Sequence, residues 1–245
     1  MSARVLITGA YRGIGAACAL AFAATGARVA LADLREPGET ADAAARAGAA
    51  ETLTLVCDVS DEASVTAVGE TVRQRFGGLD VVVHCAGVIH EAPLLETPVA
   101  DFDRVIAINL RGSFLVGKMA LGLMDGTAEA PARLILIASD MAYYGRETFS
   151  PYVASKHGVL GLVRSWAKEF APRVLVNAIC PGPIDTEMLG AANMSAEWRA
   201  RELAIPLARF GSPEEIGELA LFLAASGGRY FTGQGIGSNG GSIMP

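Results

Sequence analysis

The chain has 245 residues, of which 51% are hydrophobic, and a formal net charge of −6 at pH 7. Its 26 acidic and 20 basic residues are scattered, so it lacks the basic clusters that nucleic-acid or anionic-membrane binding requires. The length suits one large α/β domain, and we expect a single domain over residues 1–245 with neither of those partners.

The four cysteines lie far apart and form neither a CxxC pair nor a Cys/His spacing typical of a metal site. A reduced intracellular protein without a metal is the simpler interpretation. The N-terminal segment lacks the apolar core of a signal peptide, and the charge-free stretch 13–27 is too short and too interrupted by glycine to span a bilayer. We therefore expect a soluble, cytoplasmic protein.

Short apolar runs alternate along the chain with longer segments of helical periodicity. The predicted strands are 4–8, 28–32, 52–56, 80–84, 133–137, 174–178 and 235–238, and the predicted helices are 13–26, 36–48, 61–76, 98–124, 151–171 and 213–225. Thr97-Pro98 and Ser212-Pro213-Glu214-Glu215 are typical of capped helix starts. The alternation predicts a Rossmann-type doubly wound parallel sheet of about seven strands, with helices on both faces.

A glycine-rich segment connects the first predicted strand to the first predicted helix: Thr8-Gly9-Ala10-Tyr11-Arg12-Gly13-Ile14-Gly15. Glycine permits a tight turn and close approach of backbone N–H groups to a pyrophosphate, and the helix N-terminus adds partial positive charge. We expect a dinucleotide to contact Gly9, Arg12, Gly13, Ile14 and Gly15. An ordinary strand-to-helix turn is the alternative.

Asp33 ends the second predicted strand, where a carboxylate can accept hydrogen bonds from the adenosine ribose and repel a 2′-phosphate. Arg12 and Arg35 act in the opposite direction, because a guanidinium near that ribose would accommodate the phosphate. NAD is therefore favoured over NADP as the cofactor. The alternative is that Asp33 only caps the following helix.

Tyr152 and Lys156 are four residues apart on a predicted helix, so they share one face. An ammonium beside a phenol favours the phenolate and lowers the tyrosine pKa, as an acid/base group requires. Such a pair also occurs by chance on solvated helices. Ser139 follows the fifth predicted strand, at the sheet edge where ligands bind, although a turn or N-cap serine is the alternative.

Together these motifs resemble the short-chain dehydrogenase/reductase family, in its compact single-domain branch, over essentially the whole chain. The resemblance implies adenine contacts from Asp58 and Val59, an adenosine ribose contact from Ala86 and Gly87, nicotinamide contacts from Ile184 and Thr186, and a catalytic tetrad of Asn109, Ser139, Tyr152 and Lys156. It therefore implies an oxidoreductase that acts on a secondary alcohol or ketone.

The resemblance also implies a role for each member of the tetrad. Tyr152 would exchange a proton with the substrate oxygen while a hydride moves between the substrate carbon and the nicotinamide. Lys156 would lower the tyrosine pKa and bind the nicotinamide ribose, Ser139 would position the oxygen, and Asn109 would hold a water that links Lys156 to solvent.

The chain departs from the family pattern at His84-Cys85, where the family usually has two asparagines before Ala86 and Gly87. The hydrogen bonds of those amides must be replaced or lost. His84 could act as a substitute donor or take a catalytic role, but a buried histidine bonded to its neighbours is the more usual outcome at a strand end.

Two segments are predicted to enclose the substrate. Residues 187–206 have the mixed composition of a mobile lid, with Met188, Leu189, Met194 and Trp198 as wall candidates, and Asp140, Met141, Tyr144 and Phe149 would form the opposite wall. Ordinary packing against the sheet is the alternative for the methionines and the tryptophan. The composition identifies no substrate.

The predicted helices 98–124 and 151–171 carry more apolar side chains than one covering layer needs. They include Phe114, Leu115, Leu121, Leu123, Val163 and Trp166. Self-association would bury such residues. The sequence indicates an oligomer, and the resemblance implies a homotetramer.

Two other classes of function compete with the oxidoreductase. A nicotinamide-assisted lyase or epimerase usually has a longer chain with an added substrate domain. A non-catalytic regulatory protein that binds the cofactor would be expected to lose members of the tetrad, and all four are present here.

Overall fold

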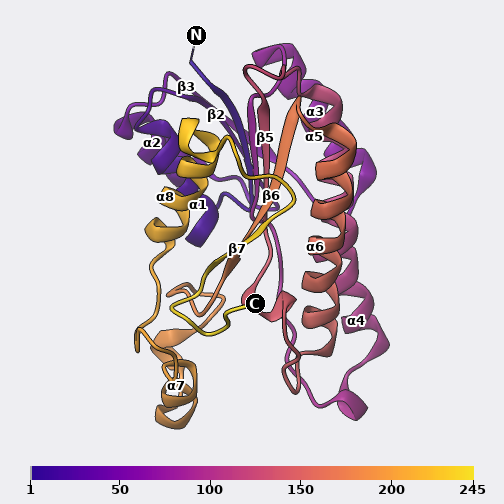
Figure 1. Ribbon diagram of the computed structural model, residues 1–245, viewed down its shortest axis with the longest axis vertical. Coiled ribbons are helices and arrows are strands. Elements are labelled where there is room, and N and C mark those ends of the chain that lie inside the picture. Colours follow the sequence, from indigo (N-terminus) through magenta and orange to yellow (C-terminus); the bar gives the residue numbers. More distant parts are fainter. Residues whose placement is uncertain (1) are drawn as a thin grey trace.

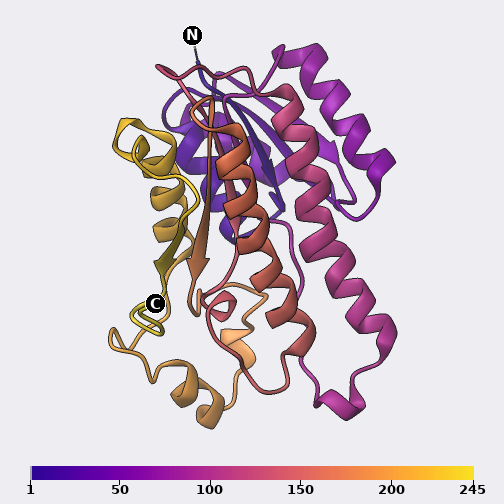
Figure 2. The same ribbon diagram turned by 45° about the vertical axis from the view of Figure 1, so that its right-hand side comes forward.

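The computed structural model describes residues 2–245. Its centre is a seven-stranded parallel sheet with the order β3-β2-β1-β4-β5-β6-β7 (Figures 1 and 2). The strands are β1 (Arg4–Thr8), β2 (Arg28–Asp33), β3 (Glu51–Val56), β4 (Val81–His84), β5 (Ala132–Ile137), β6 (Val174–Pro181) and β7 (Gly235–Ser238). The predicted Rossmann-type fold is confirmed.

Helices cover both faces of this sheet. They are α1 (Gly13–Ala23), α2 (Gly38–Ala47), α3 (Glu62–Phe76), α4 (Val99–Val105), α5 (Gly112–Leu123), α6 (Ser150–Phe170), α7 (Ala196–Glu202) and α8 (Pro213–Ala224). Helices α1, α2 and α8 form one layer, and α3, α4, α5 and α6 form the other (Figure 1). Because both faces are covered, the central strands consist of continuous buried apolar runs.

Strand β1 pairs with β2 on one side and with β4 on the other. The chain therefore reverses its direction of travel across the sheet at β1, and the loops after β1 and β4 diverge there. In open parallel sheets, ligands bind in the crevice at this switch point, outside the carboxyl ends of the strands. The glycine-rich segment follows β1 and the segment from His84 to Gly87 follows β4, so the fold brings both to this crevice.

The predicted helix 98–124 is three segments in the structure, because the π-helical turn Ile106–Arg111 separates α4 from α5. The predicted cap at Thr97 is wrong: its hydroxyl donates to the carbonyl oxygens of Ala92 and Pro93, and Pro98 occupies the N-cap position without a side-chain bond. The predicted capping box between Ser212 and Glu215 is confirmed at the start of α8.

The continuous helical stretch Val99–Leu123 is long and apolar enough to cross a membrane, a property that core helices share. Leu115, Val163 and Trp166, on this stretch and on α6, are already buried within the single chain. The prediction that self-association would bury these three residues is therefore wrong. Phe114 is 45% exposed. Part of the apolar surface that the sequence assigns to self-association thus packs inside the core of the chain.

Candidate active site

The glycine-rich turn after β1 presents bare backbone to the crevice. Gly9 has φ +67°, a left-handed conformation, and a Cβ there would lie 2.6 Å from the backbone nitrogen of Ala86. Helix α1 begins after Arg12 with no side-chain cap and no acidic residue in its first turn. Its first N–H groups are therefore free for an anion, and this cradle fits the pyrophosphate of a dinucleotide.

Asp33 lies beside this turn, at the end of β2. Its Oδ2 accepts a hydrogen bond from the backbone nitrogen of Tyr11 at 3.0 Å, and its Oδ1 accepts one from that of Arg35 at 3.3 Å. Pro37 is the N-cap residue of helix α2 and no side chain caps the helix, so Asp33 does not cap it. The carboxylate is fixed at the crevice, as a ribose contact requires.

Arg12 and Arg35 are both engaged with protein groups. Arg12 forms an ion pair with Glu187 across the crevice, and the guanidinium carbon of Arg35 lies 5.7 Å from the centre of the Tyr11 ring. The Arg12–Glu187 pair also connects the glycine-rich turn to the predicted lid.

One cavity of about 840 Å³ joins this turn to Ser139, Tyr152 and Lys156, whereas Asn109 is not part of its lining. Every predicted cofactor contact lines it: Gly9, Arg12, Gly13, Ile14, Gly15, Asp33, Asp58, Val59, Ala86, Gly87, Tyr152, Lys156, Ile184 and Thr186. The cavity passes the carboxyl ends of several strands, which is the usual position of a ligand in such a sheet. The structure thus assembles these residues, which are widely separated in the chain, around one space.

His84 is buried at the end of β4, where Nδ1 lies 2.7 Å from Oγ1 of Thr8. Its Nε2 has no hydrogen-bond partner within residues 2–245. Burial lowers the pKa of His84 to about 3, so the ring is neutral at physiological pH. His84 does not line the cavity, while Cys85 does. The histidine is therefore a structural residue, and its bond runs to a side chain of β1.

Asn109 lies in the π-helical turn, which widens the helix where it packs against α6. Its Oδ1 accepts from the backbone nitrogen of Val88 at 2.8 Å, and its Nδ2 donates to the Val88 carbonyl oxygen at 2.9 Å and to Ser155 at 3.1 Å. Its own carbonyl oxygen accepts from Ser113 at 2.5 Å. The geometry gives Asn109 an anchoring role for the loop after β4, and the predicted water-holding role stays a prediction.

Tyr152 and Lys156 lie on one face of α6, with Nζ of the lysine 5.5 Å from the centre of the tyrosine ring. Lys156 is buried and donates to the carbonyl oxygen of Ile137 at 2.9 Å. Burial lowers the pKa of Lys156 to about 8. The pair is therefore directed into the sheet edge and does not lie on a solvated surface.

The pKa of Tyr152 departs from the sequence-based expectation. Burial raises it to about 12, against a smaller lowering by the hydrogen bond with Ser139. The expected lowering by Lys156 does not dominate, because desolvation penalises the phenolate and the ammonium alike. In this structure Tyr152 holds its proton at neutral pH.

Ser139 follows β5 and has two partners in the next turn. Its hydroxyl donates to Oδ1 of Asp140 at 3.0 Å and accepts from the backbone nitrogen of Met141 at 3.2 Å. It is therefore an N-cap serine, as the alternative had it, and it also lines the cavity with Tyr152. The N-cap role is confirmed, and contact of Ser139 with a substrate oxygen stays a prediction.

Most predicted pocket walls are confirmed, since Asp140, Met141, Tyr144, Phe149, Met188, Leu189 and Trp198 line the cavity and Met194 does not. The predicted lid contains α7, and its mobility stays a prediction. Sequence reasoning missed Arg146, Glu202 and Ser242, which also line the cavity. Arg146 lies between Ser139 and Tyr152, a position that could have suggested it, but nothing in the sequence marks Glu202 or Ser242.

Known proteins match nearly the whole chain. A family model described as enoyl-(acyl carrier protein) reductase matches residues 9–242. The 3-oxoacyl-[acyl-carrier-protein] reductase FabG of Thermotoga maritima is 38% identical over 98% of this chain and 97% of its own length. The D-threitol dehydrogenase of Mycolicibacterium smegmatis is 38% identical over 96% of this chain and 91% of its own length.

Solved structures agree with these matches. A short-chain type dehydrogenase/reductase from Mycobacterium marinum has a TM-score of 0.90 and 34% identity, with 99% of this chain and 96% of that chain covered. A dehydrogenase/reductase from Sinorhizobium meliloti has a TM-score of 0.92 and 32% identity, with 100% and 96% covered. With the site geometry above, these matches show that the chain belongs to the short-chain dehydrogenase/reductase family and is an oxidoreductase that acts on CH–OH or keto groups.

Proposed function

We propose that the protein interconverts a secondary alcohol and its ketone with a nicotinamide cofactor, NAD in preference to NADP, and that Tyr152 is the acid/base. The proposal rests on one observation above all: Tyr152, Ser139 and Lys156 share a cavity with an uncapped glycine-rich turn. The relatives named above act, by their names, on a 3-oxoacyl group and on threitol, which are a ketone and an alcohol.

Each residue of the site has a defined task in this reaction. The bound nicotinamide would supply the hydride acceptor or donor. Tyr152 takes the hydroxyl proton when the alcohol is oxidised and returns it to the oxygen when the ketone is reduced. Asp140 holds Ser139 beside that oxygen, and the Lys156 ammonium stabilises the phenolate.

Replacement of Tyr152 by phenylalanine tests the proposal, since it removes only the hydroxyl group. We expect turnover of any alcohol or ketone substrate to fall by about 10³-fold or more, while the cofactor dissociation constant changes by less than about twofold. Reduced-cofactor absorbance measures the first quantity and fluorescence titration the second. Substantial activity in Tyr152→Phe would exclude Tyr152 as the acid/base.

Two contacts support the preference for NAD. Asp33 is fixed at the crevice by backbone donors from Tyr11 and Arg35, so its charge faces an adenosine ribose. The Arg12 charge is compensated by Glu187, which reduces its attraction for a 2′-phosphate. A carboxylate at this position favours the unphosphorylated ribose, and the Arg35 guanidinium, which lies over the Tyr11 ring, acts in the opposite direction.

We also propose a cytoplasmic homotetramer built on α4, α5 and α6. Val99, Phe102 and Phe114 are 75%, 40% and 45% exposed on the first two of these helices, and pairing across a two-fold axis would bury them. Light scattering should give four times the chain mass of 25.4 kDa. A mass of one chain would contradict this assembly.

A further inference from the structure

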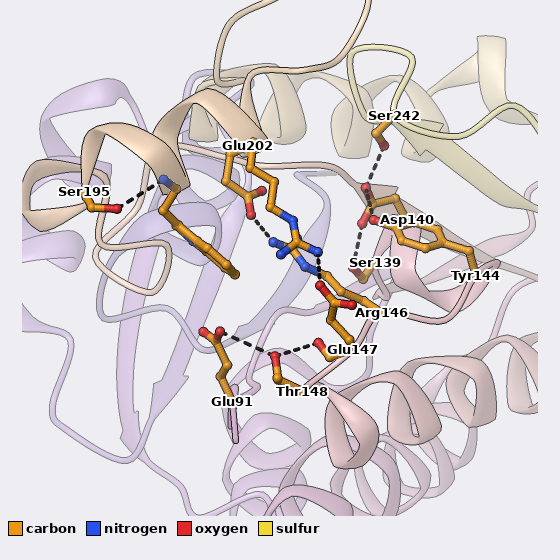
Figure 3. A network of polar contacts seen from close by, with 12 residues as sticks. Glu91, Ser139, Asp140, Tyr144, Arg146, Glu147, Thr148, Ser195, Glu202 and Ser242 are labelled. Atoms are coloured by element: carbon orange, nitrogen blue, oxygen red, sulfur yellow. Dashed lines mark hydrogen bonds and ion pairs between the residues drawn. The ribbon is translucent and has the colours of Figure 1, made fainter. Parts of the chain in front are cut away.

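A row of polar side chains leads away from Ser139 along the cavity wall (Figure 3). Oδ1 of Asp140 accepts from Ser139 at 3.0 Å, and Oδ2 accepts from Ser242 at 2.6 Å and from the Tyr144 hydroxyl at 3.5 Å. Asp140 is buried, and burial raises its pKa. The loop after β5 and the C-terminal segment therefore meet in one polar wall beside the catalytic serine.

The wall continues to an ion pair between Arg146 and Glu202, whose side chains are only 12% and 8% exposed. Arg146 comes from the loop before α6 and Glu202 from the end of α7 in the predicted lid. The guanidinium carbon lies 4.9 Å from the Phe149 ring centre and 5.0 Å from that of Trp198. Aromatic rings thus hold the planar guanidinium in place at the cavity.

Stability alone gives a weak reason for this pair. Removing two charges from water costs several kcal/mol per ion, and a well-packed apolar pair of similar volume is often as stable. Both residues line the cavity. A guanidinium has five N–H donors, yet within residues 2–245 Arg146 donates only to Glu202. Donor capacity therefore remains on Arg146, and acceptor capacity remains on Glu202.

The charges of the wall decide which ligand group suits it. Asp140 and Glu202 both act on the charge of Arg146. Glu91 also lines the cavity, and the charge of Arg201 there is paired with Glu147, so acids remain in excess. A carboxylate or phosphate would meet this excess of acids, and an alkyl chain would leave the remaining donors and acceptors unpaired. Hydroxyl groups donate and accept at once, so they satisfy both kinds of group.

We propose that Arg146 and Glu202, with Asp140 and Tyr144, form a subsite for the distal hydroxyls of a neutral polyhydroxylated alcohol or its keto-sugar. The reacting CH–OH group lies at Tyr152 and Ser139, and the remaining hydroxyls extend along the wall toward the ion pair. This assignment rests on the proposed function and adds the substrate class. The ion pair selects the substrate, and it takes no part in the proton or hydride transfer.

A substrate series tests the subsite in the intact enzyme. Oxidation of sec-butanol, a vicinal butanediol, erythritol and xylitol is measured with NAD, and reduction of a 3-oxoacyl thioester is measured with NADH and with NADPH. We expect kcat/KM to rise by about tenfold or more for each added hydroxyl that reaches the wall. Preference for sec-butanol or for the thioester over every polyol overturns the subsite.

Variants then locate the effect. A single substitution would leave one buried charge uncompensated, so Arg146→Met and Glu202→Met are combined. The double variant should lose about 100-fold in kcat/KM for the best polyol and less than about threefold for sec-butanol. The matched control replaces the exposed Lys118–Glu62 pair by methionines, which should change neither value.

The outcomes separate the two proposals. Equal losses for polyol and sec-butanol in the Arg146/Glu202 double variant overturn the subsite, because the pair would then support the whole site. If the wild-type protein oxidises sec-butanol but gains nothing from added hydroxyls, the subsite fails and the proposed function stands. If it converts no alcohol and no ketone with either nicotinamide cofactor, the proposed function fails.

Discussion

The two ends of the cavity recognise ligands with different parts of the chain. At the cofactor end, the glycine-rich turn, the open N-terminus of α1 and Asp33 lie within three consecutive elements, and much of the surface is backbone. At the substrate end, Asp140, Arg146, Glu202 and Ser242 come from segments far apart in sequence and meet through side chains. The contacts to the pyrophosphate and the adenosine ribose thus begin from one local segment, whereas the substrate end depends on tertiary contacts.

This difference explains how the two ends can vary. A site formed by backbone N–H groups allows most neighbouring side chains to vary, but its closest contacts require glycine because a Cβ would not fit there. A wall of side chains changes with each substitution while the fold persists, which suits a fold that serves many substrates. The predictions below test this contrast, from the largest expected effect to the smallest.

Gly15→Ala should have the largest effect at the cofactor end. A Cβ at Gly15 would lie 2.7 Å from the carbonyl carbon of Gly9, so the turn must distort. We expect the NAD dissociation constant to rise by about 100-fold or more, measured by calorimetry. Gly38→Ala is the control, because a Cβ there meets nothing within 4 Å. Unchanged NAD affinity in Gly15→Ala would show that the turn does not hold the cofactor.

The pH dependence should differ between the two directions of the reaction. Because burial raises the pKa of Tyr152 to about 12, the protonated form needed for ketone reduction dominates at neutral pH, and the phenolate needed for oxidation is scarce. Oxidation should accelerate by up to about tenfold per pH unit, with a shallower rise above pH 8, where Lys156 loses its proton.

Steady-state rates in both directions across the alkaline range check this dependence. Tyr230→Phe, a substitution of a fully exposed tyrosine, should leave the profiles unchanged. A pH-independent oxidation rate would contradict the assignment of the base.

Asp33→Ala should narrow the preference for NAD over NADP. The substitution removes the charge that repels a 2′-phosphate and leaves Arg35 nearby. We expect the ratio of kcat/KM values for the two cofactors to shift toward NADP by about tenfold. Asp42→Ala on the exposed face of α2 is the matched control. A ratio that does not move would remove Asp33 from cofactor selection.

At the cavity itself His84→Asn should have the smallest effect, because the histidine does not line it, and its effect is confined to stability in acid. The folded-state pKa of His84 is about 3, below the unfolded value of 6.5, so the fold favours the neutral ring. This contribution is complete above pH 6.5 and is lost as the pH falls, because the unfolded chain binds a proton that the folded chain does not. Between pH 6.5 and about 4, the free energy of unfolding should decrease in both proteins. The decrease should be about 3 kcal/mol larger for the wild type than for His84→Asn.

Denaturant unfolding at several pH values measures this difference. His157→Asn, which replaces an exposed histidine on α6, should retain the wild-type acid dependence. Parallel curves for wild type and His84→Asn would mean that His84 takes up its proton in the folded state.

The strands and the cofactor end were predictable because their signals are short-range. Arg4–Thr8 reads as a buried strand from its own apolar run, and the glycines that follow it identify the turn. The π-helical turn at Asn109 could not be predicted, because its hydrogen bonds run to Val88 and Ser155, which the helical periodicity does not reveal. Tyr152 lines the cavity at the position that its motif predicts, but the direction of its pKa shift depends on burial that only the folded chain shows.

The substrate end was predicted only in part. The residues between Ser139 and Tyr152 were located from their position in the chain, and the Arg146–Glu202 pair was missed because its partners are far apart in sequence. In the sequence, a charged residue on an exposed lid cannot be distinguished from a charged residue that lines a cavity. The Arg146–Glu202 contact, on which the proposed substrate class rests, is therefore visible only in the folded chain.

Transfer of deuterium from an alcohol labelled at its carbinol carbon tests the central claim most directly. Wild-type protein is incubated with NAD and labelled polyol, and the cofactor and product are analysed by mass spectrometry. An alcohol oxidoreductase places one deuterium on the nicotinamide for each ketone formed, and Tyr152→Phe should abolish this transfer. Deuterium that returns to an isomerised product or is lost to water without net cofactor reduction would contradict the account and indicate an epimerase or a lyase.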